Sequence, residues 1–268
     1  MSESVRVEAK PILSTEDEGH VRHLVLDRPE KRNAQNGELV VALRDAAREA
    51  ADDPDVRCVV LSGAGRCFSA GVDVFELASS AGQTGMLRVF RRACIEAANM
   101  LEEMKKPVIA QIHGACLGLG AELALACDLR VMADDVQFGL PETKLGLIPD
   151  VGGSSRLPAI AGLGNAKDLI MTGRAVGADE ALRMGIANRL AGEGELERVT
   201  EELVEELLAA SPLAVGLSKG VLDAVARPTL GASLELEVTT QQTLVTSADF
   251  REAGAAFLEK RKPNWSNS

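Results

Sequence analysis

The pattern of apolar residues changes near residue 195, from alternating strand and helix patterns to helix patterns alone. This change limits the possible folds more than any single motif does. Before that point, apolar runs rich in β-branched residues and bounded by Gly, Pro or Asp predict strands. These runs lie at 20–27, 56–63, 107–114 and 128–134. Amphipathic patterns predict helices between them, at 37–51 and 86–105. Beyond residue 195 every pattern is helical, at 195–211, 212–226, 230–245 and 248–261. Strands that alternate with helices predict an α/β fold with parallel strand pairing.

The chain has 268 residues, of which 46% are hydrophobic. That length suffices for one well-packed core and a smaller appended region. The helical tail is too thin to bury its own apolar faces, so we expect it to pack on the core or on a neighbouring subunit. We therefore divide the chain into a core at 1–195 and a helical C-terminal region at 196–268.

Charge and cysteine usage exclude several classes of function. The net charge of −11 disfavours a nucleic acid as partner, because such a surface repels phosphates. The five cysteines show no CxxC spacing, which argues against a metal site and favours buried free thiols in a cytoplasmic protein. We find neither an apolar signal region at the N-terminus nor a run of about 20 apolar residues, so no membrane association is expected.

A glycine-rich junction at 113–128 (HGACLGLGAELALACD) is the first candidate for chemistry. A predicted strand enters glycines and then a helix that begins near Gly120. Unpaired N–H groups and the helix dipole at such a start favour negative charge, as in an oxyanion site. The dinucleotide fingerprint GxGxxG fails here, because Leu123 occupies its third glycine position.

Acidic side chains lie in and after this junction. Glu122 follows the helix start among small and apolar neighbours, so its carboxylate is either paired or has a raised pKa. Glu142 and Asp150 each follow a proline in the segment 138–158. Another glycine-rich segment, 63–73 (GAGRCFSAGVD), follows a strand and permits close backbone approach.

Taken together, these segments resemble the enoyl-CoA hydratase/isomerase (crotonase) family over nearly the whole chain. The resemblance is carried by LDRPEKRNA (26–34), CFSAGVD (67–73), residues 112–158, GRAVGADEALRMGIANRL (173–190) and AAFLEKRKP (255–263). It implies a spiral core of repeated ββα units that holds the CoA and catalytic site. It also implies a helical C-terminal region for oligomerisation and active-site cover, and assembly as a homotrimer or as a hexamer of paired trimers.

The resemblance further implies an acyl-CoA thioester as substrate, with coenzyme A as part of that substrate and no separate cofactor or metal. The thioester oxygen is expected between the backbone N–H groups of Ala70 and Leu119. Leu119 departs from the glycine common at that position in similar hydratases, but it keeps the N–H donor. Contacts with substrate or CoA are expected from Arg28, Lys31, Ala34, Ser69, Gly71, Asp73, Gly118, Pro141 and Lys260.

The expected reaction depends on which of the acidic residues Glu122, Glu142 and Asp150 take part. In similar hydratases two glutamates, here Glu122 and Glu142, act with a water that adds across the double bond of a trans-2-enoyl-CoA. In similar dienoyl-CoA isomerases an aspartate stands at the position of Asp150. An enoyl-CoA or dienoyl-CoA isomerase using Glu142 and Asp150 is therefore the alternative. For Asp150, a structural role as a helix N-cap or loop residue also stays open.

A non-enzymatic descendant of the family is a third reading, either as a scaffold or as an RNA-binding protein. The net charge of −11 argues against RNA. The acids and both glycine-rich segments argue against a scaffold, because a scaffold has no physical need for buried carboxylates.

Overall fold

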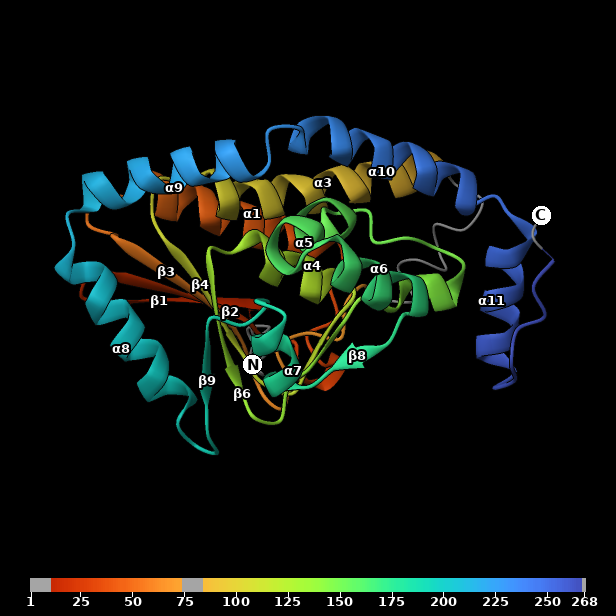
Figure 1. Ribbon diagram of the computed structural model, residues 1–268, viewed down its shortest axis with the longest axis horizontal. Coiled ribbons are helices and arrows are strands. Elements are labelled where there is room, and N and C mark those ends of the chain that lie inside the picture. Colours follow the sequence, from red (N-terminus) through yellow and green to blue (C-terminus); the bar gives the residue numbers. More distant parts are fainter. Residues whose placement is uncertain (1–10, 74–83, 267–268) are drawn as a thin grey trace, which may run out of the picture.

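The computed structural model describes residues 11–73 and 84–266, and its centre is a six-stranded sheet partly covered by helices (Figure 1). The strands are β1 (Leu13–Glu18), β2 (Val21–Leu26), β3 (Cys58–Gly63), β4 (Val108–Ile112), β6 (Leu129–Ala133) and β9 (Arg189–Ala191), in the order β1-β2-β3-β4-β6-β9. All neighbours are parallel except β1 and β2, which form an antiparallel hairpin through Gly19 (φ 58°). The predicted parallel pairing is therefore confirmed for β2, β3, β4 and β6.

Two of these strands were missed by the sequence analysis, for a physical reason. β1 reads LSTEDE and its last four residues are exposed, so it lacks the apolar alternation that predicts a strand. β9 has only three residues. Tertiary pairing with β2 and β6 holds these two strands in the sheet, and periodicity does not detect such pairing.

A small second sheet carries the glycine-rich junction. It contains β5 (Ala115–Leu117), β7 (Gln137–Gly139) and β8 (Ala175–Val176), in the order β5-β7-β8. β5 leads through Gly118 directly into α4 (Leu119–Ala126), which is buried along its whole length. The second sheet therefore fixes where α4 begins.

The long helices match the predicted ranges. They are α1 (Gly37–Asp52), α3 (Thr84–Glu103), α8 (Leu196–Ala209), α9 (Pro212–Ala226), α10 (Leu230–Leu244) and α11 (Ala248–Leu258). The shorter helices are η1 (Pro29–Lys31), η2 (Pro141–Leu145), α5 (Gly153–Ala161), α6 (Leu163–Thr172) and α7 (Ala178–Arg183). In Figure 1, α9 and α10 run one after the other above α1 and α3, and α11 stands at the opposite end from α8.

The helical C-terminal region contacts the core close to the predicted chemistry. Glu237 and Gln241 of α10 accept hydrogen bonds from the backbone N–H groups of Gly152 (2.8 Å) and Ile148 (3.1 Å). α11 packs beside η2, where a β-carbon on Gly146 would lie 3.2 Å from Phe250. The predicted mixed α/β fold with a helical C-terminal region is confirmed.

Among the described residues, no single helix is long and apolar enough to cross a bilayer. α8 and α9 reach that length and composition only together, across a bend of 104°. All five cysteines are buried and none forms a disulfide, as predicted.

Candidate active site

A cavity of about 110 Å³ brings the two glycine-rich segments and the three acids together. Its walls come from the loop after β3, from α3, from the start of α4, from η2 and from the turn before α5. The lining residues are Ala70, Gly71, Val72, Phe90, Arg91, Cys94, Gly118, Leu119, Glu122, Pro141, Glu142, Leu145, Leu147, Asp150 and Val151. Segments far apart in the sequence thus converge on one site.

The N-terminus of α4 supplies one anion-binding donor. Leu119 is the first residue of the helix, and its N–H donates no hydrogen bond within the described residues. Gly118 makes the turn into the helix with a φ of 52°, a conformation that favours glycine. Leu119 itself has no positive φ, so leucine fits this position without backbone strain. Its side chain narrows the cavity, and its N–H remains free for an oxyanion.

The predicted second donor, Ala70, is contradicted by the structure. The Ala70 N–H donates to the Arg32 carbonyl at 2.9 Å and is therefore already used. Two residues on, Val72 lies between Gly71, whose carbonyl accepts from Gln35, and Asp73, whose N–H donates to Gln35. In such a bridge the polar groups of the middle residue point to the opposite side. Among the described residues the Val72 N–H is thus the donor without a partner beside the cavity, and the motif alone could not distinguish it from its neighbours.

Glu122 is held firmly at the base of the site. Only 2% of the residue is exposed, and Oε1 accepts hydrogen bonds from the N–H groups of Val151 (2.7 Å) and Gly153 (2.9 Å). Burial raises the pKa of this carboxyl, while the two N–H donors and the nearby Arg91 oppose that rise. The two bonds fix the position of the side chain and stabilise its charged form.

Glu142 has a different environment on η2. Its Oε2 is buried and has no hydrogen-bond partner among the described residues. Burial, and next the charge of Glu122, raise the pKa of Glu142 to about 8. Two neighbouring carboxyls that differ in this way suit an acid and a base, because one accepts two backbone hydrogen bonds that stabilise its charge whereas the other has an oxygen that accepts none among the described residues.

Asp150 also faces the cavity, and it forms an ion pair with Arg91 of α3. The residue is 1% exposed, and α5 is capped by Gly152, so the N-cap alternative is wrong. Arg91 was missed by the sequence analysis. A signal was present, since Arg91 lies three residues before Cys94 and seven before Ala98, on the buried face of α3.

Several predicted binding residues have structural partners instead of facing the cavity. Arg28 forms an ion pair with Asp73 (3.3 Å) and donates to the Ala34 carbonyl. The buried Ser69 hydroxyl donates to the Asn33 carbonyl at 2.8 Å. These bonds shape the loop that presents Gly71 and Val72. Among the other residues expected to contact substrate or CoA, Gly71, Gly118 and Pro141 line the cavity, whereas the exposed Lys31 and Lys260 do not.

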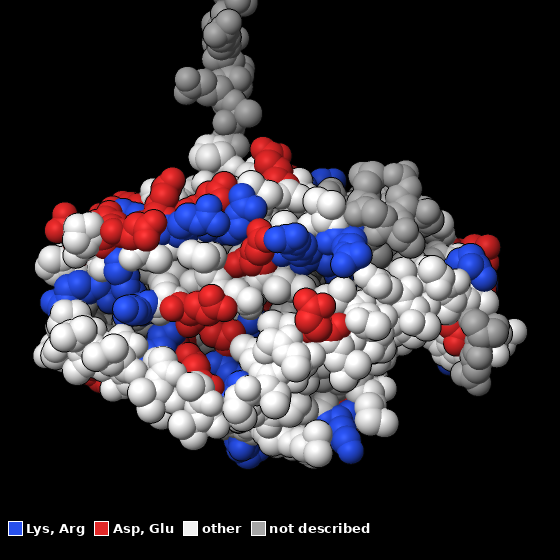
Figure 2. Space-filling view, turned by 90° about the horizontal axis from the view of Figure 1, so that it is seen from above, with Lys and Arg blue, Asp and Glu red and all other residues white. Residues whose placement is uncertain are grey.

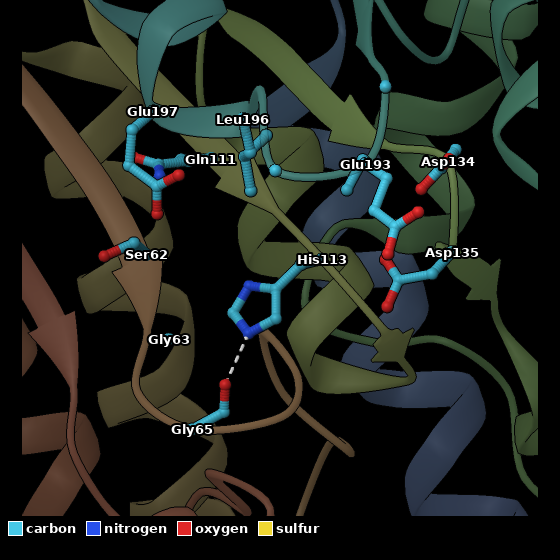
Figure 3. A pocket seen from close by; sticks show the side chains of 13 residues that line it. Ser62, Gly63, Gly65, Gln111, His113, Asp134, Asp135, Glu193, Leu196 and Glu197 are labelled. Carbon is cyan, nitrogen blue, oxygen red and sulfur yellow. Dashed lines mark hydrogen bonds between the residues drawn. The ribbon is translucent and has the colours of Figure 1, made fainter.

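A larger cavity of about 630 Å³ lies at the carboxyl ends of β3, β4 and β6 (Figure 3). His113 lies there, and its Nε2 is 2.9 Å from the Gly65 carbonyl. The acids in its wall are Asp134, Asp135, Glu193 and Glu197. Four carboxylates would repel the phosphates of coenzyme A. We therefore place the chemistry in the smaller cavity.

Comparisons with known proteins identify the family of the chain. Residues 16–268 match the family profile described as enoyl-CoA hydratase/isomerase. The chain belongs to the enoyl-CoA hydratase/isomerase family. It is 35% identical to a short-chain-enoyl-CoA hydratase of Clostridium acetobutylicum, over 92% of this chain and 94% of that protein. It is 32% identical to a peroxisomal Delta(3,5)-Delta(2,4)-dienoyl-CoA isomerase of Arabidopsis thaliana, over 95% of both chains.

Solved structures show the same family fold. An enoyl-CoA hydratase from Mycobacterium avium subsp. paratuberculosis superposes with a TM-score of 0.87 at 27% identity, covering 96% of this chain and 99% of that one. An enoyl-CoA hydratase/isomerase from Pseudoalteromonas atlantica gives 0.85 at 30% identity, covering 96% and 100%. The predicted crotonase fold is confirmed. Hydratases and isomerases both occur among the relatives at similar identity, so family membership does not select the reaction.

Proposed function

We propose that this enzyme is an enoyl-CoA hydratase that adds water across the 2,3 double bond of a trans-2-enoyl-CoA. The observation that carries the proposal is the pairing of Glu122 and Glu142 in one cavity beside the N–H groups of Val72 and Leu119, which have no acceptor within the described part of the chain. Glu122 accepts two backbone hydrogen bonds, whereas Glu142 Oε2 accepts none among the described residues, and this difference suits a base and an acid.

In the proposed reaction the thioester oxygen accepts hydrogen bonds from Val72 N–H and Leu119 N–H. The Glu122 carboxylate takes a proton from water as the water oxygen bonds to C3. The electrons of the double bond move toward the thioester, and the two N–H donors stabilise the enolate. Glu142 then gives its proton to C2, so H and OH have been added. Transfer of a proton from Glu122 to Glu142 restores the starting state.

Binding of the coenzyme A portion is proposed from the family resemblance. Lys31 and Lys260 are exposed cations suited to its phosphates. Arg28 and Asp73 support the loop that presents Val72, and Ala34, Ser69, Gly71, Gly118 and Pro141 shape the walls next to it. The reaction requires no other cofactor.

An isomerase is the second candidate, because Asp150 lies in the same cavity as Glu142. Its ion pair with Arg91 argues for the hydratase. A carboxylate held by a guanidinium is stabilised in its charged form, and taking a proton from the substrate would disrupt that pair. Glu122 and Glu142 have no such ion pair among the described residues.

The test is the mass of the product formed from a short trans-2-enoyl-CoA. A gain of one water supports the hydratase. No mass change, together with conversion of a 3,5-dienoyl-CoA to its conjugated isomer, would support the isomerase instead. Asp150→Asn is the matched variant: it should retain hydration and would abolish an isomerisation that depends on Asp150.

We also propose assembly as a homotrimer or a dimer of trimers. α9 exposes an apolar stripe at a spacing of four residues, formed by Leu213, Leu217, Val221 and Val225, which are 55–78% exposed. Figure 2 views the molecule from the side on which α9 lies, and broad uncharged areas separate its charged groups. Apolar side chains exposed in such a row are typical of a subunit interface.

A further inference from the structure

A second, smaller cavity lies behind the acyl site. It measures about 30 Å³, and its walls include Val238, Gln241 and Val245 of α10. Arg91 and Asp150 line both this cavity and the active-site cavity. The Arg91–Asp150 pair is therefore the partition between the two spaces, at a wall of the site that holds the two glutamates.

Three polar atoms at this partition are buried without a hydrogen-bond partner among the described residues. They are Arg91 Nε, Asp150 Oδ2 and Gln241 Nε2. The orientation of the Gln241 amide follows from its other bond, because Oε1 accepts from the Ile148 N–H at 3.1 Å and only an oxygen can do so. The amide NH₂ is therefore the free end. Gln241 is 2% exposed and Asp150 is 1% exposed, so bulk water does not satisfy them.

These atoms define the chemistry of a missing partner. A buried polar group without a partner is costly, so such groups in native proteins normally bind a ligand or an ordered water. Here there are two donors, on Arg91 and Gln241, and one acceptor, on Asp150. A hydroxyl is the small group that can accept from one side and donate to the other. About 30 Å³ is the space that one water-sized group occupies.

Hydrogen-bonding capacity favours a neutral hydroxyl over a carboxylate. The charges of Arg91 and Asp150 cancel within their ion pair, and Arg88 adds a cation to the wall of the smaller cavity. A carboxylate could accept from the arginines, but it has no proton to donate to Asp150 Oδ2 and would be repelled by it. A plain hydrocarbon end would leave all three polar atoms unpaired.

We propose that the acyl pocket is specific for an enoyl-CoA whose acyl chain carries a hydroxyl at its far end, held by Gln241, Arg91 and Asp150. This specificity rests on the proposed function, because it assumes that an acyl-CoA occupies the neighbouring site. Gln241 and Arg91 are then specificity-determining residues, whereas Glu122 and Glu142 perform the chemistry.

The experiment compares pairs of trans-2-enoyl-CoA substrates in which a terminal hydroxyl replaces a terminal methyl, in chains of increasing length. The number of heavy atoms in each pair is equal, so chain length is not a variable within a pair. The readout is the ratio of kcat/KM for the two members, measured for the full-length wild type, for Gln241→Leu and for Gln137→Leu. Gln137 is exposed on β7 and lines neither cavity, so it provides the same substitution away from the site.

At one chain length, we expect wild type and Gln137→Leu to prefer the hydroxylated substrate by about tenfold, the effect of one or two hydrogen bonds. In Gln241→Leu the ratio should fall toward one. Because both substrates are assayed on the same variant, a general loss of folded enzyme cancels from the ratio. Equal kcat/KM for every pair in wild type, or a preference unchanged in Gln241→Leu, would overturn the proposal and indicate that an ordered water alone satisfies these atoms.

Failure of the proposed function gives a different result. If neither substrate is turned over, the dissociation constants of the matching saturated acyl-CoA thioesters are measured by calorimetry on the same three proteins. Tighter binding of the hydroxylated thioester that depends on Gln241 would uphold the specificity even when hydration is absent. Equal binding of the two thioesters would overturn it.

Discussion

Glu122 accepts a hydrogen bond from the Gly153 N–H at 2.9 Å, whereas Glu142 Oε2 has no hydrogen-bond partner among the described residues. The close approach depends on glycine, because a β-carbon on Gly153 would lie 2.9 Å from Glu122 Oε1. One carboxylate is thus fixed by the backbone, and the other is free to exchange a proton with a substrate.

Replacing Glu142 by Gln should reduce hydration by about a hundred-fold to ten-thousand-fold, because the amide cannot supply the proton. The size and burial of the side chain are preserved, so binding of a saturated acyl-CoA, measured by calorimetry, should change little. Glu193→Gln is the control, since Glu193 lies in the larger cavity. A larger loss of turnover in Glu193→Gln than in Glu142→Gln would move the chemistry to that cavity.

The rate should fall as the pH rises through about 8. Burial and the charge of Glu122 raise the pKa of Glu142 from its ordinary value of 4.5 to about 8, so the acid holds its proton below that pH and loses it above. A plot of kcat/KM against pH should show this limb as an apparent pKa of the Glu122–Glu142 pair. A rate that increases through pH 8 would contradict the role of Glu142 as a proton donor.

Leu119→Pro should remove one oxyanion donor while keeping the helix. Leu119 is the first residue of α4, a position that tolerates proline because its N–H is not needed by the helix. We expect a loss in kcat of about a hundred-fold to a thousand-fold. Leu119→Gly removes the side chain but retains the N–H, and it should remain within about tenfold of wild type. Equal losses in the two variants would assign the effect to the side chain, and thermal melts identify any variant that does not fold.

Glu237→Gln should make the stability less dependent on pH. Burial raises the pKa of Glu237 to about 7, so between pH 4.5 and 7 the folded state binds a proton that the unfolded state lacks. The free energy of unfolding therefore falls as the pH rises through this window, by on the order of 2 kcal/mol from this group. Glutamine can accept from the Gly152 N–H and donate to the Ser155 hydroxyl without titrating.

Thermal melts of wild type and Glu237→Gln at pH 5 and pH 8 measure this effect. The loss of melting temperature between the two pH values should be smaller in the variant by several degrees. An identical loss in the two proteins would show that Glu237 does not titrate on unfolding in this range.

Leu217→Lys should weaken assembly, because it places a charge in the exposed apolar stripe of α9. Light scattering should give a mass of three or six chains for wild type and a smaller mass for the variant. Ser218→Lys adds the same charge at an exposed position beside the stripe, and it should assemble as wild type does. A monomeric wild-type protein would refute the proposed oligomer.

The sequence alone determined the order of the long helices and of the buried strands, because their periodic apolar faces are local properties of the chain. It also indicated the convergence of Glu122, Glu142 and Asp150, through motifs whose order is specific. It did not determine β1, β9 or the small second sheet, whose strands are polar or very short and depend on pairing with distant segments.

Only the tertiary structure decided which backbone N–H groups are free. The motif does not show whether the N–H of Ala70 or that of Val72 is available to a ligand. In the structure the Ala70 N–H donates to the carbonyl of Arg32, which lies in a separate segment of the chain, and the Val72 N–H does not. Only the tertiary structure also shows that polar atoms of Arg91, Asp150 and Gln241 lie together without partners among the described residues, because these residues come from three separate segments. Whether a buried donor has a partner depends on three-dimensional contacts between such segments, and local sequence patterns carry no record of them.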